Sequence, residues 1–160
     1  MSRVESRIAE HELLLPAPMH VPGGVKIKFP WVNIRGDRAY CSGHIPLTAD
    51  GLPAGPFGQV GAEVSKDEAH LLARNAGLSM LASLKRALGD LDRVTAWCRV
   101  FGMVNSAPGF DQHPFVINGF TDLILEIYGE DAGAHSRSAI GVAGLPMNVA
   151  VEVEAEVIFR

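Results

Sequence analysis

The last stretch of the chain, from Asn148 to Arg160, alternates strictly between apolar and polar side chains. A period of two is typical of a β-strand with one buried and one polar face. The apolar face comprises Val149, Val151, Val153, Ala155, Val157 and Phe159, and the polar face comprises Glu152, Glu154 and Glu156. Three acids on one strand face are too polar for a sealed core. The chain therefore needs a sheet whose second face meets water or a polar subunit interface.

The composition predicts one folded domain. The 160 residues are 48% hydrophobic and 20% charged, with a mean hydropathy of +0.16, which excludes a disordered chain. A net charge of −4 and the lack of a basic stripe argue against nucleic-acid binding. Cys41 and Cys98 lack the number and spacing of a disulfide framework or zinc site, so we expect a reduced, cytoplasmic protein. Neither a signal peptide nor a membrane-spanning apolar run is visible, so no membrane partner is expected.

The first quarter of the chain predicts a short helix followed by a hairpin. Ser2 to Leu15 has helical periodicity. Val25 to Ile34 is strand-like, and Pro30 within it favours an edge position or a bulge. Gly36-Asp37 forms a tight turn into a second strand over Arg38 to Ser42. Residues 1–24 are accordingly assigned as an N-terminal helix and extension, and residues 25–160 as the main domain.

Two long helices follow from clear start and stop signals. Ser65 and Glu68 stand at capping-box spacing before an apolar helical face, and Gly89 can cap the end. A second helix is expected to start near Pro114 and to run to Tyr128, with Gly129 as its stop.

The remaining strands complete a ββαβαββ order. Arg93 to Val104 is β-branched and aromatic, as in a strand covered on both faces. Ser136 to Val142 is the next strand, before the alternating one, while the Gly- and Pro-rich stretch from Pro46 to Val64 is a surface loop. The fold class is therefore α+β, with a mixed sheet and two long helices packed on one face.

Candidate chemistry gathers around Arg137. The sequence lacks dinucleotide, phosphate-loop, nucleophile-elbow and zinc-helix motifs, so no cofactor or metal is expected. Arg137 is the only Lys or Arg between Arg99 and Arg160 and stands between two serines at a strand start. Its planar guanidinium could bind a carboxylate. The alternative is a structural ion pair with a sheet glutamate, and Glu152 gains interest because a terminal hairpin could bring it near Arg137.

Weaker candidates lie elsewhere. Ser42-Gly43 ends a strand, where a hydroxyl and a backbone N–H could meet a ligand, although such pairs commonly just begin a loop. Asn118, in the first turns of the second helix, could donate its amide to a ligand or serve in local capping.

Two segments carry a resemblance to a known family. RAYCSGHIPL (residues 38–47) and HSRSAIGVAGLPMNVAVEVEAEVIF (residues 135–159) resemble the Rid family of reactive-intermediate deaminases, also called the YjgF or L-PSP endoribonuclease family. The resemblance covers nearly the whole chain from about Val25. The prefixed helix and the longer loop after Val104 indicate a longer, divergent branch rather than RidA proper.

The resemblance implies a chorismate-mutase-like fold and a homotrimer with clefts between subunits, without a cofactor or metal. It implies that Arg137 holds the carboxylate of a 2-imino or 2-aminoacrylic acid and that Glu152 positions the attacking water. Substrate-binding roles fall to Ser42, Gly43, Asn118 and Ser138.

This sequence departs from RidA at two positions. Ala139 replaces a cysteine, and Phe29 or Trp31 stands in place of an active-site tyrosine, so Trp31 is counted among the substrate-binding residues. His44 or His135 could supply the polar contact that the missing tyrosine leaves.

Three functions are compatible with these residues. The first is hydrolytic deamination of imino and enamine acids to 2-keto acids and ammonium. The second is a non-catalytic trimer that binds a small carboxylate as a sensor. The third is an endoribonuclease, against which the acidic balance and the lack of a basic groove argue.

Overall fold

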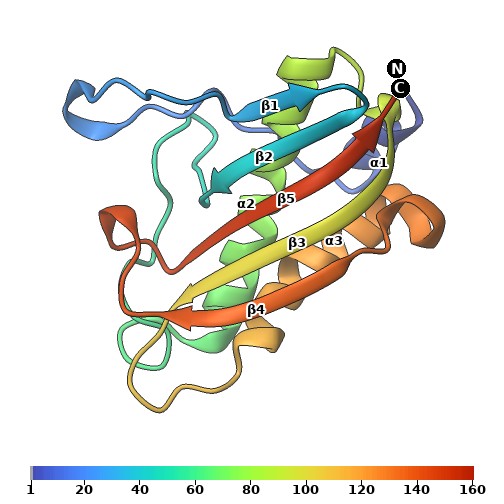
Figure 1. Cartoon of the computed structure of the whole chain (residues 1–160). Helices are drawn as coiled ribbons and strands as arrows, with labels where there is room; N and C mark the ends of the chain where they lie inside the picture. The colour runs from blue at the N-terminus through green and yellow to red at the C-terminus, as the bar shows by residue number, and fades with distance from the viewer. Residues whose placement is uncertain (1) are drawn as a thin grey trace.

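The computed structural model describes residues 2–160 and has the predicted ββαβαββ order after one prefixed helix. Five strands form one sheet in the order β1-β2-β5-β3-β4, and both long helices lie on the same side of it (Figure 1). The elements are α1 (Arg3–Glu10), β1 (Val32–Arg35), β2 (Arg38–His44), α2 (Lys66–Leu88), β3 (Val94–Asn105), α3 (His113–Gly133), β4 (Ser136–Val142) and β5 (Val151–Phe159), with short 3-10 turns at Pro22–Gly24, Leu91–Arg93 and Pro146–Asn148.

The alternating strand β5 lies at the centre of the sheet. It pairs antiparallel with β2 on one side and with β3 on the other. Val151, Val153 and Val157 are fully buried under the helices, whereas Glu154 on the opposite face is exposed. The predicted separation of apolar and acidic faces is therefore confirmed.

The predicted local signals are confirmed at the start of α2 and at the first hairpin. Ser65 accepts from the Glu68 N–H at 3.1 Å, and the Glu68 carboxylate accepts from the Ser65 N–H at 2.9 Å. Gly36, with φ of +60°, turns β1 into β2 in the conformation that favours glycine. β1 is an edge strand, as Pro30 indicated.

The N-terminal segments are shorter than predicted. α1 ends at Glu10 rather than Leu15 because Glu12 takes a left-handed φ of +55°, and the Leu13 N–H returns to the Ile8 carbonyl at 3.0 Å. This hydrogen bond and the left-handed residue are the features of a Schellman cap. The predicted strand over Val25–Ile34 shrinks to β1, because the preceding residues have no neighbouring strand and run along an arm that projects from the body (Figure 1).

Two further expectations need correction. β3 is not covered on both faces, since Thr95 and Arg99 are exposed on the side away from the helices. α3 breaks at Gly129, with φ of +79°, as predicted for its stop, but one more helical turn follows to Gly133.

α2 and α3 approach each other closely through glycines. A Cβ at Gly119 would overlap the backbone carbonyl oxygen of His70, and one at Gly77 would overlap the side chain of Leu123. Because a backbone atom cannot move aside cheaply, the spacing of the two helices depends on residue 119 remaining without a side chain.

We predict that Gly119→Ala lowers the free energy of unfolding by about 1–3 kcal/mol or more, the usual cost of forcing extra volume into a packed contact. Urea unfolding of the variant measures this loss. Gly144→Ala is the matched control, because a Cβ there meets nothing within 4 Å. Equal stability of the two variants would contradict the close approach.

Candidate functional site

Arg137 lies on the edge strand β4 and points toward α3. Its Nη1 donates to Asn118 Oδ1 and to Thr121 Oγ1, both at 2.9 Å, and its Nη2 donates to the Pro114 carbonyl at 3.3 Å. These acceptors recur at helical spacing, so one face of α3 meets the guanidinium. With His135, they form what we call the arginine half-site: Pro114, Asn118, Thr121, His135 and Arg137.

The charge of Arg137 has no acidic partner in the described part of the chain. Its acceptors are two neutral side chains and a carbonyl, and no carboxylate of residues 2–160 lies within ion-pair distance of it. Burial lowers the pKa of Arg137, yet a guanidinium stays protonated at neutral pH. Within residues 2–160 of one chain, Arg137 therefore forms no ion pair with a sheet glutamate.

The donors that Arg137 keeps match a carboxylate. A guanidinium has five N–H groups, of which three are used here, so the Nε–H and one Nη2–H remain. Two N–H groups on neighbouring nitrogens fit the two oxygens of a carboxylate. The exposed Asn118 side chain directs its oxygen to Arg137, which leaves its amide N–H groups available as well.

Glu152 occupies the other face of the sheet, beside a bulge in β2. Ser42 and Gly43 stand opposite a single residue of β5, because Cys41 pairs with Ala155 and His44 with Val153. The Glu152 carboxylate lies where a Cβ of residue 43 would be, so it rests directly on the Gly43 backbone. Burial raises the pKa of Glu152, and the negative charge of Glu154 raises it further.

Ser42 ties the bulge to the arm that precedes β1. Its N–H donates to the Trp31 carbonyl at 3.0 Å, and its hydroxyl donates to the Pro30 carbonyl at 2.9 Å. His44 is buried, its Nδ1 lies 2.6 Å from the Ser42 carbonyl, and its ring lies 5.4 Å from that of Trp31. Burial lowers the pKa of His44 to about 4. We call Ser42, Gly43 and Glu152 the glutamate half-site. Trp31 and His44 do not belong to it, because they line a cavity with Ser83 and Arg86 of α2, on the helix-covered side of the sheet.

The two half-sites do not meet within one chain. β3 separates β4 from β5, so the predicted terminal hairpin does not form. Arg137 faces the helices, whereas Glu152 lies on the face away from them. Ser138 follows Arg137 along the strand and is exposed on the opposite face. A site that uses both Arg137 and Glu152 therefore needs two copies of the chain.

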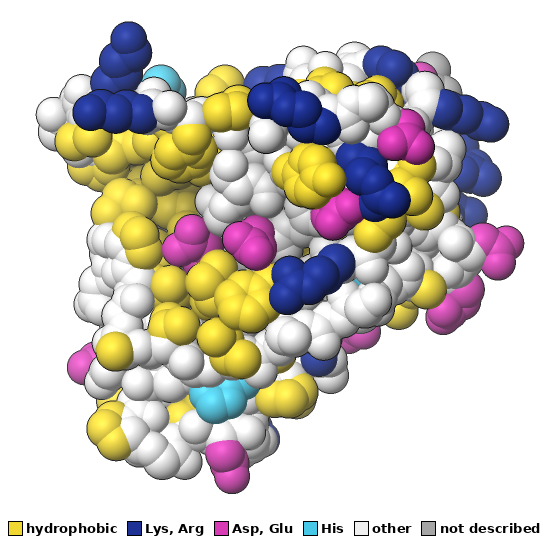
Figure 2. Space-filling model, viewed as in Figure 1, with side chains coloured by type: hydrophobic (Ala, Val, Ile, Leu, Met, Phe, Trp, Pro, Cys, Tyr) yellow, Lys and Arg dark blue, Asp and Glu magenta, His cyan; other side chains and the backbone are white. Residues whose placement is uncertain are grey.

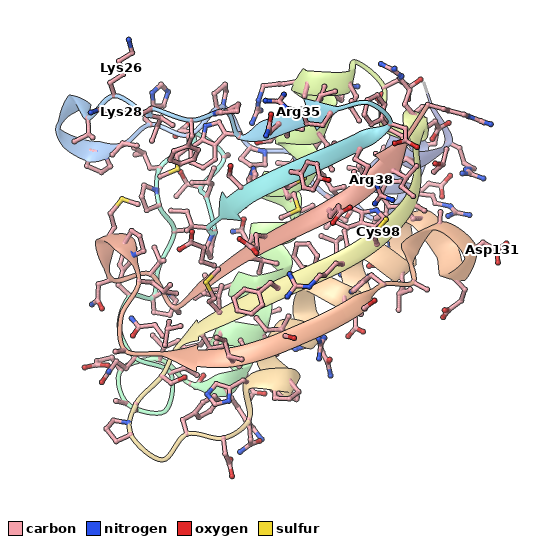
Figure 3. The ribbon with its side chains drawn as sticks, viewed as in Figure 1. Lys26, Lys28, Arg35, Arg38, Cys98 and Asp131 are labelled. Carbon is pink, nitrogen blue, oxygen red and sulfur yellow. The ribbon has the colours of Figure 1, made fainter. Side chains whose placement is uncertain are left out.

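The surface around the glutamate half-site is mixed in character. Figure 2 shows acidic, basic and apolar side chains interspersed over the sheet, with a hollow beneath the projecting arm. Lys26 and Lys28 extend from the arm away from the body, and Arg35 and Arg38 flank the β1–β2 turn (Figure 3). The sheet face that carries Glu152, Glu154 and Glu156 is therefore polar enough to meet either water or a polar subunit interface.

Sequence reasoning missed Thr121, whose only signal is its spacing of three residues from Asn118. Of the two histidines proposed to replace the family tyrosine, His135 lies in the arginine half-site, whereas His44 is buried against α2 and does not lie beside Glu152. Within residues 2–160, no three His, Cys, Asp or Glu residues gather as metal ligands would. In that same range, no helix has the length and apolar character needed to cross a membrane.

The family model described as "YjgF/chorismate_mutase-like, putative endoribonuclease" matches residues 5–156. The chain belongs to the YjgF family. A second member, Protein TCP17 of Trypanosoma cruzi, is 41% identical over 120 residues, which cover 75% of this chain and 74% of that protein.

Two solved structures place this YjgF chain by its fold. The protein Atu1372 of Agrobacterium tumefaciens, described as of unknown function, has a TM-score of 0.88 and 33% identity, with 99% of this chain and 93% of that chain covered. A "putative endoribonuclease" from Shewanella oneidensis has a TM-score of 0.86 and 31% identity, with coverage of 98% and 99%. The predicted chorismate-mutase-like fold is confirmed.

We predict that Glu152 titrates above the ordinary glutamate value of 4.5, because burial and Glu154 both disfavour its charged form. Glu154→Gln removes one of these causes and should lower the pKa of Glu152 without restoring the ordinary value. Carbon NMR of the side-chain carboxyl groups measures the titration. In Glu10→Gln, on α1, the Glu152 titration should stay unchanged; an equal shift in both variants would refute the interpretation.

Proposed function

We propose that this YjgF-family protein hydrolyses the imine and enamine forms of small 2-amino acids to 2-keto acids and ammonium, at a site shared by two copies of the chain. The observation that carries the proposal is Arg137, a partly buried cation with neutral neighbours and two free N–H groups. Family membership and the glutamate half-site support it.

Arg137 would hold the carboxylate of the substrate. Its remaining N–H groups can form two parallel hydrogen bonds, which fix both the position and the plane of the bound acid. The amide of Asn118 can donate to the same ligand. Because the groups that accept hydrogen bonds from Arg137 are neutral, a substrate with one carboxylate would balance the charge of its guanidinium.

Glu152 would act as the general base. A protonated imine carbon is electrophilic, so water can attack it while the Glu152 carboxylate takes one proton from that water. The carbinolamine receives that proton on nitrogen from Glu152, and the carbon–nitrogen bond breaks. As the carbonyl forms, the Glu152 carboxylate takes the hydroxyl proton and passes it to the departing ammonia, which leaves as ammonium. An enamine substrate first takes a proton on its β-carbon to become the imine. The raised pKa of Glu152 makes it a better proton acceptor than an ordinary exposed glutamate.

The two half-sites would complete each other across a subunit interface, in the homotrimer that the family resemblance implies. Each of the three clefts would combine the arginine half-site of one copy with the glutamate half-site of the next. The polar, glutamate-bearing sheet face would be covered in that assembly.

The same tests also distinguish the two alternative functions, the carboxylate sensor and the endoribonuclease. Binding of a carboxylate without turnover of any imino acid would favour the sensor. Ribonuclease activity that disappears in Arg137→Ala would favour the endoribonuclease, against which the net charge of −4 argues.

We predict that wild-type protein accelerates keto-acid release from imino acids generated in situ by an amino-acid oxidase. Arg137→Ala should lose about a hundredfold or more of kcat/KM, as expected when one partner of a desolvated charge pair is truncated. Arg35→Ala is the matched control, since Arg35 lies on β1 at the opposite edge of the sheet (Figure 3). Full activity of a folded Arg137→Ala variant would refute the proposal.

We predict that two inactive variants complement each other. Oligomers that contain both Arg137→Ala and Glu152→Gln chains, purified through two different tags, keep one interface with both native residues. A mixed trimer should therefore regain about one third of wild-type activity. The controls are the two homo-oligomers, one of each variant. Mixed oligomers as inactive as these controls would show that the catalytic groups do not come from neighbouring chains.

A further inference from the structure

A series of hydrogen bonds leads from the Nη1 of Arg137, away from its free Nε–H and Nη2–H groups, to Thr121 and His135. Thr121 Oγ1 lies 2.9 Å from Arg137 Nη1 and 3.0 Å from His135 Nε2. The other ring nitrogen of His135, Nδ1, lies 2.7 Å from the Gly133 carbonyl oxygen. The chain of contacts joins α3, which carries Thr121 and Gly133, to β4, which carries Arg137, through His135 in the connection between them.

The direction of every bond in this chain can be assigned. A carbonyl oxygen only accepts, so the Nδ1 of His135 carries a proton and donates it. Burial lowers the pKa of His135, and the charge of Arg137 lowers it further, so the ring is neutral near pH 7 and its Nε2 is an acceptor. The Thr121 hydroxyl must then donate to His135, which turns an oxygen lone pair toward the Nη1–H of Arg137.

We propose that Thr121 and His135 are positioning residues that fix the orientation of Arg137 for carboxylate binding. The inference rests on the proposed function, because it takes Arg137 to be the carboxylate anchor. Arg137 has a long flexible side chain, and two N–H groups must point at one ligand for a two-bond contact. Thr121 restrains the Nη1 end of the guanidinium, and His135 restrains Thr121 by accepting its proton.

The arrangement also explains why these neighbours are neutral. An acid at position 121 would satisfy Arg137 and compete with the carboxylate of the ligand, whereas a hydroxyl directs the guanidinium without neutralising it. The groups whose charges act on this cluster are Arg137 itself, which faces His135, and Asp122 on α3, which acts on Arg137.

The test measures pyruvate, the simplest 2-keto acid, binding to the full-length protein by calorimetry. Thr121→Val keeps the shape and removes the hydroxyl, and His135→Phe removes the acceptor of its proton. Each should weaken pyruvate binding roughly tenfold, the scale of one hydrogen bond to a charged group. Thr121→Ser restores a hydroxyl and should bind within about twofold of wild type.

Ser106→Ala is the matched control, because Ser106 Oγ lies 2.9 Å from His113 Nε2 and forms a similar hydroxyl–imidazole contact that does not include Arg137. It should leave pyruvate binding unchanged. Thermal melts of all variants identify any that fail to fold. If Thr121→Val is one of them, Thr121→Ser and His135→Phe still test the contact between Thr121 and His135.

Arg137→Ala separates this inference from the proposed function. If Arg137→Ala abolishes pyruvate binding while Thr121→Val and His135→Phe bind as wild type does, the positioning role is overturned and the anchor stands. If Arg137→Ala binds pyruvate normally, or wild type does not bind it, the anchor itself fails and the inference falls with it. Weakened binding in Ser106→Ala to the same extent as in Thr121→Val would also overturn the inference.

Discussion

The division of β5 into a valine face and a glutamate face is the constraint on which the rest of the structure depends. The valines must be buried under the two long helices. Because β5 pairs with both β2 and β3, this apolar face lies at the centre of the sheet. The glutamates forbid an equivalent apolar layer on the other side. One face of the sheet therefore holds the core, and the other remains available for polar contacts.

The division of the sheet into two faces also separates Arg137 from Glu152. Arg137 belongs to the helix-covered face at one edge of the sheet, and Glu152 belongs to the glutamate face two strands away. In the proposed hydrolysis, neither half-site would suffice on its own, since Arg137 would bind the carboxylate and Glu152, whose pKa is raised, would act as the base. The proposed reaction would therefore need two copies of the chain, because the strand order keeps Arg137 and Glu152 apart within one copy.

Much of the fold could be predicted from local sequence signals. The alternation of β5, the capping box at Ser65 and the turn at Gly36 each depend on neighbouring residues, so they could be predicted directly. Strand neighbours depend on contacts between distant residues, and the prediction of a terminal hairpin was wrong for that reason. The early end of α1 depended on Glu12 adopting a left-handed conformation, which helical periodicity does not reveal.

The residues of the candidate site also differ in whether local sequence signals could predict them. Arg137 stood out because it is the only Lys or Arg between Arg99 and Arg160, and Asn118 because it lies in the first turns of the second helix, where the resemblance also pointed to it. Thr121 had no distinguishing signal, since its role exists only once β4 packs beside α3. Its contribution could not be found without the tertiary contact.

The bulge in β2 has a consequence for sequence variation. The Glu152 carboxylate fills the space that a side chain at residue 43 would take, so the two positions share one volume. A relative of this fold that keeps a long acid at the position of Glu152 is held to glycine at the position of Gly43. A relative with a small residue at 152 is released from that restriction, and the two positions are expected to change together rather than one at a time.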